Sequence, residues 1–161
     1  MIHYFRFKQL WRAIENDSLN IDDYLQDVYW RSMLTEEEIR KTAAIITEVQ
    51  NAKTFAEFLL VFSYTTEEFA DTFDRDIVET ERWMHRETDF PIRMKQSYAF
   101  MMITNYIAAG RQHTCRRCDA TFLSTENEDC CKDCRESIEN QRKLFEEPKF
   151  KIQLEMILKT E

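Results

Sequence analysis

The sequence contains very little glycine and proline: there is one Gly and there are two Pro in 161 residues. This scarcity leaves few of the turns that hairpins and large sheets need. It also excludes a glycine-rich phosphate-binding loop. Long apolar runs are missing as well, so the sequence predicts neither a signal peptide nor a membrane-spanning segment. We therefore expect a mainly α-helical cytoplasmic protein with reduced cysteines and no membrane association.

Sequence motifs typical of enzymes are also missing. The chain has no H-E-x-x-H metalloprotease motif and no G-x-S-x-G nucleophile elbow. Its three histidines, His3, His85 and His113, lie far apart in the sequence. These absences predict that the protein is not an enzyme.

The net charge of −8 restricts the choice of partner. A chain this acidic gains no affinity for nucleic acid from its bulk charge, so contact with DNA requires a local basic face. An acidic surface is equally suited to a basic protein partner. The 43% of apolar residues is sufficient for a core, and the length suits one compact domain with a small appended module.

Two C-x-x-C pairs, separated by twelve residues, are the most specific motif in the chain. Pairs at this spacing are typical of a structural zinc site with four thiolate ligands and no open coordination position. The predicted zinc ligands are Cys115, Cys118, Cys131 and Cys134. Two disulfides are the alternative. As a ligand, Cys130 can also replace Cys131, and His113 can replace Cys115.

The zinc-binding module is expected to span residues 111–136. Thr121, Phe122 and Leu123 predict a short strand that packs Phe122 beside the metal, and residues 124–129 form a polar loop tip. The residues between the two pairs are too few to build a core of their own. Metal binding therefore supplies much of the folding free energy, on the order of 10 kcal/mol.

Apolar residues recur at helical spacing through residues 1–110 and predict a helical domain. A first helix covers roughly residues 5–15, and capping residues at Asn20, Thr35 and Thr54 open three more. The side chains predicted to face the core in these helices are Phe5, Phe7, Leu10, Trp11, Ile14, Ile21, Tyr24, Leu25, Val28, Tyr29, Ile39, Ala43, Ile46, Val49, Phe58, Leu59 and Phe62.

Residues 64–91 predict two short helices with a tight break between them. Thr65 and Glu68 form a capping box for the first helix, and Asp76 caps the second after the break at Asp74-Arg75. The core-facing residues are Phe69, Ala70, Phe73, Ile77, Val78, Trp83 and Met84. A small residue such as Ala70 lets two helices cross closely, as in a helix-turn-helix. The alternative is two ordinary core helices.

This segment resembles the lambda-repressor/Cro-like helix-turn-helix family. The matching residues are Glu68-Phe69-Ala70, Phe73, Arg82-Trp83 and Pro91, whereas Arg75 and Thr80 stand where the family usually has buried aliphatic residues. The resemblance implies that residues 76–87 are a recognition helix for double-stranded DNA. The DNA contacts expected from it are Arg75, Arg82, His85 and Arg86. In the zinc module, the expected phosphate contacts are Arg111, Arg116, Arg117, Lys132 and Arg135.

Residues 92–109 form the longest apolar-periodic stretch, and Gly110 is expected to end this helix as its C′ residue. A helix that ends in Gly and leads into C-x-x-C-x-x-x-F looks like the zinc region of the C subunit of the bacterial flagellar master regulator. That family is a DNA-binding activator, and the resemblance covers about residues 98–134.

Residues 137–161 are predicted to form C-terminal helices. One continues from Cys134 through Ile138, Leu144 and Phe145 to Pro148. A last amphipathic helix carries Phe150, Ile152, Leu154, Met156, Ile157 and Leu158. It either docks on the core or serves as a homodimer or partner helix.

Two functions follow from these patterns. The first is a DNA-binding transcriptional regulator with a helix-turn-helix and a structural zinc site. The alternative is an acidic zinc-containing adaptor or inhibitor that binds another protein, such as a nucleic-acid enzyme. Residues 64–96 carry five basic residues against nine acidic ones. Clustering of those five on one face favours DNA, and scattering favours the adaptor.

Overall fold

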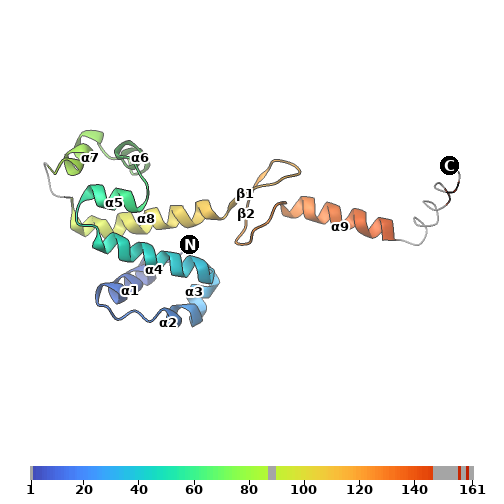
Figure 1. Ribbon diagram of the computed structural model, residues 1–161, viewed down its shortest axis with the longest axis horizontal. Helices are drawn as coiled ribbons and strands as arrows, with labels where there is room; N and C mark the ends of the chain where they lie inside the picture. Colours follow the sequence, from blue (N-terminus) through green and yellow to red (C-terminus); the bar gives the residue numbers. More distant parts are fainter. Residues whose placement is uncertain (1, 87–89, 147–155, 157–158, 160–161) are drawn as a thin grey trace. The chain divides into compact units, whose positions relative to one another are not determined.

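The computed structural model describes residues 2–86, 90–146, 156 and 159 (Figure 1). Helices make up 67% of the structure, so the expected mainly α fold is confirmed. Within the described residues, strands occur only in one two-stranded sheet of the cysteine-rich region. The chain divides into two units, residues 1–108 and 109–161, which are described separately below. No described helix is both long enough and apolar enough to cross a membrane.

Five helices form the first half of the helical unit: α1 (Tyr4–Glu15), α2 (Ile21–Gln26), α3 (Val28–Met33), α4 (Glu36–Asn51) and α5 (Phe55–Val61). Thr35 and Thr54 each make the predicted capping box, and the Asn20 side chain accepts from the Asp22 N–H. All four residues predicted to face inward from α4 are buried.

The second predicted helix is in fact two helices, because Asp27 interrupts it. The Asp27 carboxylate accepts a hydrogen bond of 3.1 Å from the Trp30 N–H and caps α3. This break changes the phase of the helix. Trp30 consequently enters the core, whereas Val28 is 85% exposed instead of buried as predicted.

Three more helices complete this unit: α6 (Thr66–Thr72), α7 (Ile77–Met84) and α8 (Ile92–Gly110). Thr65 makes its capping box with Glu68, and Asp76 caps α7 through the Val78 N–H. Asp74 adopts a left-handed conformation, with φ of 49°, in the break between α6 and α7. Asp tolerates this conformation better than most residues, because its short polar side chain can hydrogen-bond locally.

Aromatic side chains dominate the core around α5. The Phe55 ring lies 5.2 Å from that of Phe69, 5.5 Å from that of Trp83 and 4.9 Å from that of Phe90. These contacts join α5, α6, α7 and the segment before α8. The ring pairs are tilted or edge-to-face, the arrangements that aromatic quadrupoles favour.

Several side chains predicted to be in the core are exposed. Phe5 is 65% exposed, because two residues along a helix lie on nearly opposite faces and Phe7 takes the inward one. In α7, Ile77 and Val78 are also exposed, since the helix buries Thr80 and Trp83 instead. Phe62 is only partly buried.

The second unit contains β1 (Gln112–Thr114), β2 (Thr121–Leu123) and α9 (Lys132–Glu146). The strands pair antiparallel, with His113 opposite Phe122. The predicted strand is thus confirmed, and its partner β1 was not predicted. Gly110 is the last residue of α8 and has no positive φ, so it is not the predicted left-handed C′ residue. Helix α9 begins before Cys134, and of the predicted last helix only Met156 lies within the described residues.

Candidate metal centre

The structure brings the two C-x-x-C pairs together. The Sγ atoms of Cys115, Cys118, Cys131 and Cys134 all lie within 4.8 Å of one another. The Sγ atoms of Cys118 and Cys131 are 3.7 Å apart. A tetrahedral zinc–thiolate centre with bonds of about 2.3 Å places its sulfurs about 3.8 Å apart. The donor set and its spacing therefore fit a metal ion such as zinc.

The hairpin connection carries the first pair of cysteines. Cys115 follows β1, donates its N–H to the Ala120 carbonyl at 2.9 Å, and accepts from the Asp119 N–H at 2.9 Å. Asp119 has a φ of 58°, which turns the chain back towards β2. This tight turn holds the Cys115 and Cys118 side chains near one point.

The start of α9 carries the second pair, with Cys131 just before the helix and Cys134 in its first turn. The Arg135 N–H donates to the Cys131 carbonyl at 3.0 Å and closes this turn. Residues three apart in a helix lie on the same face, so Cys131 and Cys134 present their sulfurs together. The backbone contacts alone thus orient the two sulfurs of each pair towards one another.

Charged side chains connect the hairpin turn to the loop before α9. Arg116 donates its backbone N–H to the Asp129 carbonyl at 2.8 Å, and its guanidinium pairs with the Asp129 carboxylate at 3.1 Å. Arg135 of α9 pairs with Glu128. These contacts give Arg116 and Arg135 partners within the module. The Arg116 side chain remains exposed, and Arg117 is exposed as well.

The sulfurs of the cluster differ in their affinity for protons. Backbone N–H groups of Cys131 and Cys118 stabilise the Cys115 thiolate and lower its pKa to about 6. Hydrogen bonding to the Cys131 side chain, together with burial, raises the pKa of Cys134 to about 12. Additional thiolates in so small a space repel one another. Full ionisation of the cluster therefore requires a cation, and binding a soft divalent metal is the chemistry that these residues can perform.

Neither alternative ligand belongs to the four-sulfur group. The His113 ring stacks on Phe122 with centroids 5.5 Å apart, and its Nε2 lies 3.2 Å from the Ser124 carbonyl oxygen. Phe122 thus packs on His113. Cys130 is half-buried, and burial raises the pKa of its thiol.

The α6–α7 pair places one predicted DNA contact, Arg75, largely inside the protein. The Arg75 guanidinium pairs with Glu79 at 3.2 Å and lies 5.4 Å from the centroid of the Trp83 ring. Its side chain is 28% exposed. Trp83 itself is buried, as predicted, and the buried Thr80 hydroxyl donates to the Asp76 carbonyl at 2.9 Å.

The other basic residues of this segment lie in different surroundings. Arg82, His85 and Arg86 are exposed at the C-terminal end of α7. Lys95, on α8, donates to the Ala52 carbonyl at the end of α4. The surroundings of these cations therefore differ: Arg75 and Lys95 each contact other groups of the protein, and the residues at the end of α7 are exposed.

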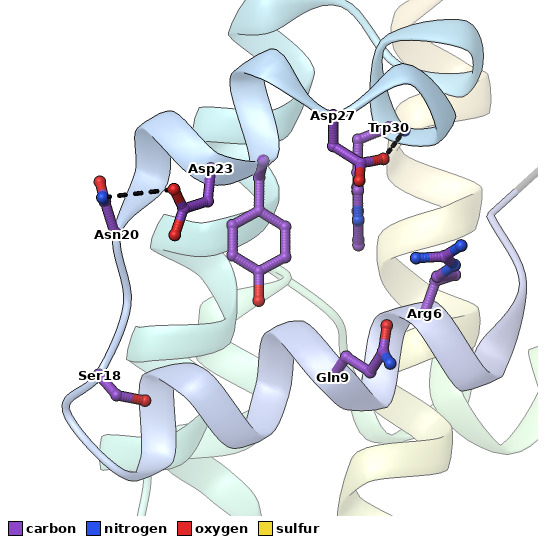
Figure 2. Close-up of a pocket in the computed structure, with 8 residues that line it drawn as sticks. Arg6, Gln9, Ser18, Asn20, Asp23, Asp27 and Trp30 are labelled. Atoms are coloured by element: carbon purple, nitrogen blue, oxygen red, sulfur yellow. Dashed lines mark hydrogen bonds between the residues drawn. The ribbon is translucent and has the colours of Figure 1, made fainter.

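A cleft of about 220 Å³ between α1 and the α2–α3 segment was not predicted from the sequence (Figure 2). Figure 2 shows Arg6 and Gln9 on α1 pointing towards the space beneath Asp23 and Asp27. Burial raises the pKa of the Tyr24 hydroxyl in this cleft, and the Asp23 and Asp27 carboxylates raise it further. The acidic residues that flank Tyr24 in the sequence are the signal that could have indicated this cleft.

Comparisons of the chain with protein-family models, with curated proteins and with solved structures each find no match. A function for the chain therefore has to be inferred from its own residues.

Proposed function

We propose that the chain is an acidic adaptor with a structural zinc site, and that its helical unit binds a basic segment of another protein. The placement of the basic residues in 64–96 carries this proposal. Arg75 is used internally by Glu79 and Trp83, and Lys95 by the Ala52 carbonyl. With these two cations held within the protein, fewer remain for a DNA backbone, which needs several Lys or Arg contacts at once.

The cleft of Figure 2 supports a basic partner. Its carboxylates belong to Asp23 on α2 and to Asp27, the cap residue between α2 and α3, and both raise the pKa of the Tyr24 hydroxyl. A lysine or arginine side chain can place its charge near these carboxylates and its alkyl stem along an aromatic ring. Arg6 lies over the Tyr29 ring, 4.8 Å from its centroid, and so already has an aromatic partner in this region.

Zinc fits the four-sulfur cluster better than other metals that proteins commonly bind, because tetrahedral sites with four thiolates are typical of zinc or iron–sulfur centres and the C-x-x-C pairs follow zinc spacing. With four protein ligands the ion has no open position for water or substrate. Its role in this proposal is structural, and the protein is not an enzyme. None of the five cysteines forms a disulfide, which suits a reducing cytoplasm.

The test uses the zinc-loaded chain as bait in nuclease-treated extract of source cells. It compares the partners recovered by the unmodified chain with those recovered by two variants. The double variant Asp23→Asn/Asp27→Asn removes both charges but keeps an Asn at the cap of α3, where Asn serves as well as Asp. Asp22→Asn, on the exposed side of α2, is the matched control. We expect nuclease-resistant partners that the double variant loses and the control retains. Equal recovery by all three proteins would contradict the proposal.

DNA-binding regulation is the second candidate, favoured by the exposed group Arg82, His85 and Arg86 at the end of α7. The α6–α7 pair, with Ala70 and Trp83 buried, is also compatible with a helix-turn-helix. Selection from random DNA duplexes at physiological salt tests this candidate. If Arg82 contacts phosphate, Arg82→Ala flattens the log–log salt dependence of binding by about 0.9. If the selection enriches no duplex, the DNA-binding candidate is rejected and the adaptor is the remaining proposal.

A further inference from the structure

A second cleft in the helical unit has the opposite character to that of Figure 2. Its volume is about 560 Å³, and it lies where the second half of α1, the end of α4 and the first half of α8 meet. Two cations, three carboxamides and one carboxylate line it: Arg12, Lys95, Gln50, Asn51, Gln96 and Glu15. In a protein with a net charge of −8, a cleft with more cations than carboxylates stands out as a site for an anion.

The hydrogen-bond donors in this cleft are largely unused. Among the described residues, the side chains of Arg12, Asn51 and Gln96 have no hydrogen-bond partner. Gln50 uses one of its two amide N–H groups, on the Trp11 carbonyl at 2.9 Å. Lys95 uses one of its three on the Ala52 carbonyl. A ligand rich in acceptor oxygens can therefore gain several hydrogen bonds here without breaking any within the protein.

The helix ends around the cleft have both signs, with the C-terminal ends of α1 and α4 negative and the N-terminal half of α8 positive. The carbonyls at the end of α4 bring partial negative charge, but Lys95 donates to one of them and neutralises it locally. The first half of α8 contributes the positive end of its dipole. Burial lowers the pKa of Lys95, which indicates that its ammonium group has lost part of its hydration. A bound anion would replace that lost solvation.

We infer that this cleft binds a small phosphate monoester of nucleotide size, with its phosphate between Arg12 and Lys95. The guanidinium of Arg12 can donate two parallel hydrogen bonds to a phosphate, and the ammonium of Lys95 adds a point charge. Asn51 and Gln96 each offer a donor and an acceptor, the pair that reads the edge of a nucleobase. Glu15 accepts from a hydroxyl of the ligand. The volume lies within the range of small-molecule sites, about 300–1,000 Å³.

The experiment is a titration of the full, zinc-loaded chain, labelled with ¹⁵N, followed by two-dimensional NMR. The probes are adenosine monophosphate, ribose 5-phosphate, inorganic phosphate and adenosine. We expect the amides of Gln50, Asn51 and Gln96 to shift with the phosphate-bearing probes. Affinity is expected to fall in the order given, and adenosine is expected to bind most weakly because it lacks the anion.

Three variants test the residues of the cleft. Arg12→Gln and Lys95→Met are each expected to lower the affinity for adenosine monophosphate by about tenfold. This is the effect of losing one charge-assisted hydrogen bond. Arg31→Gln removes an exposed cation of α3 outside the cleft and is expected to leave the affinity unchanged. Arg12 is exposed, so its variant should fold normally and carries the test even if Lys95→Met does not fold.

Two outcomes would overturn the inference. The first is the absence of shifts at the cleft amides with every phosphate-bearing probe at millimolar concentration. The second is an equal loss of affinity in Arg31→Gln and Arg12→Gln, which would mean that only general charge attracts the probe. Both outcomes are independent of the adaptor proposal, which concerns a different cleft and a protein ligand.

Discussion

Removal of the metal should unfold the cysteine-rich module and leave the helical unit intact. The perturbation is chelation of the full chain under reducing conditions, compared with the variant Cys131→Ser. Since metal binding to such a module is coupled to its folding, the two perturbations are expected to have the same effect. NMR spectra should lose the dispersed signals of residues 111–135 and keep those of residues 2–86.

The expected magnitude follows from how little this module buries. Among the described residues beyond 108, Cys115 is the only one in the buried core set, and Phe122 is half-buried against His113. Two strands of three residues each are not stable alone in water. Zinc binding to four thiolates contributes on the order of 10 kcal/mol in isolated zinc peptides. No other interaction described in the module approaches that free energy, because its ion pairs lie at the surface, where such a pair is worth about 0–1 kcal/mol.

Elemental analysis of the purified, chelator-free protein is the direct assay, with one zinc per chain expected. Cys130→Ser is the matched control, because it removes the adjacent thiol, which lies outside the four-sulfur group. Cys130→Ser should retain the metal, and Cys131→Ser should lose it. Protein that contains no metal, or an equal loss in both variants, would refute the assignment of ligands.

Two further predictions concern α5. Phe58→Ala removes a fully buried ring that contacts Phe62 and Phe90, and should lower the free energy of unfolding by about 3–5 kcal/mol in chemical denaturation. Leu60→Ala in the same helix should change it by less than about 0.5 kcal/mol, because Leu60 is 75% exposed. Glu57→Gln tests pH dependence. The Lys53 N–H is the main cause that lowers the pKa of Glu57 below its ordinary 4.5. The stabilisation from this carboxylate is therefore present above pH 4.5 and lost as pH falls through the lowered pKa. Wild type should exceed Glu57→Gln in stability at pH 7, and the two should converge in acid.

Helix starts could be predicted from sequence because capping is local. Thr35, Thr54 and Thr65 each bond to a backbone N–H three residues ahead, and each meets a Glu at that position. No tertiary contact is needed to form these bonds. The four cysteines were predictable for a similar reason, since the geometry of one tetrahedral ion fixes the spacing of its ligands.

The features that sequence analysis missed depend on tertiary contacts. The apolar pattern of α2 continues smoothly through Asp27, so the break there became clear only from the burial of Trp30 in the core. The contacts of Arg75 were missed for the same reason. A break before a helix suggested a side chain free to approach DNA, whereas Trp83 and Glu79 hold the guanidinium against the protein.

In our proposals the cysteine-rich module and the helical unit have different roles, which follow from their side-chain chemistry. A metal held by four thiolates has no open position, so in our proposal the cysteine-rich module supplies structure and no reaction. Recognition then has to come from side chains with unsatisfied charge or hydrogen-bonding capacity. The helical unit has two clefts of this kind, with Asp23 and Asp27 in one and Arg12 and Lys95 in the other. Because the two clefts share no lining residue, our two proposals are compatible with one chain holding a basic protein segment and a phosphorylated small molecule together. The variants Asp23→Asn/Asp27→Asn and Arg12→Gln should each remove one of these activities and leave the other.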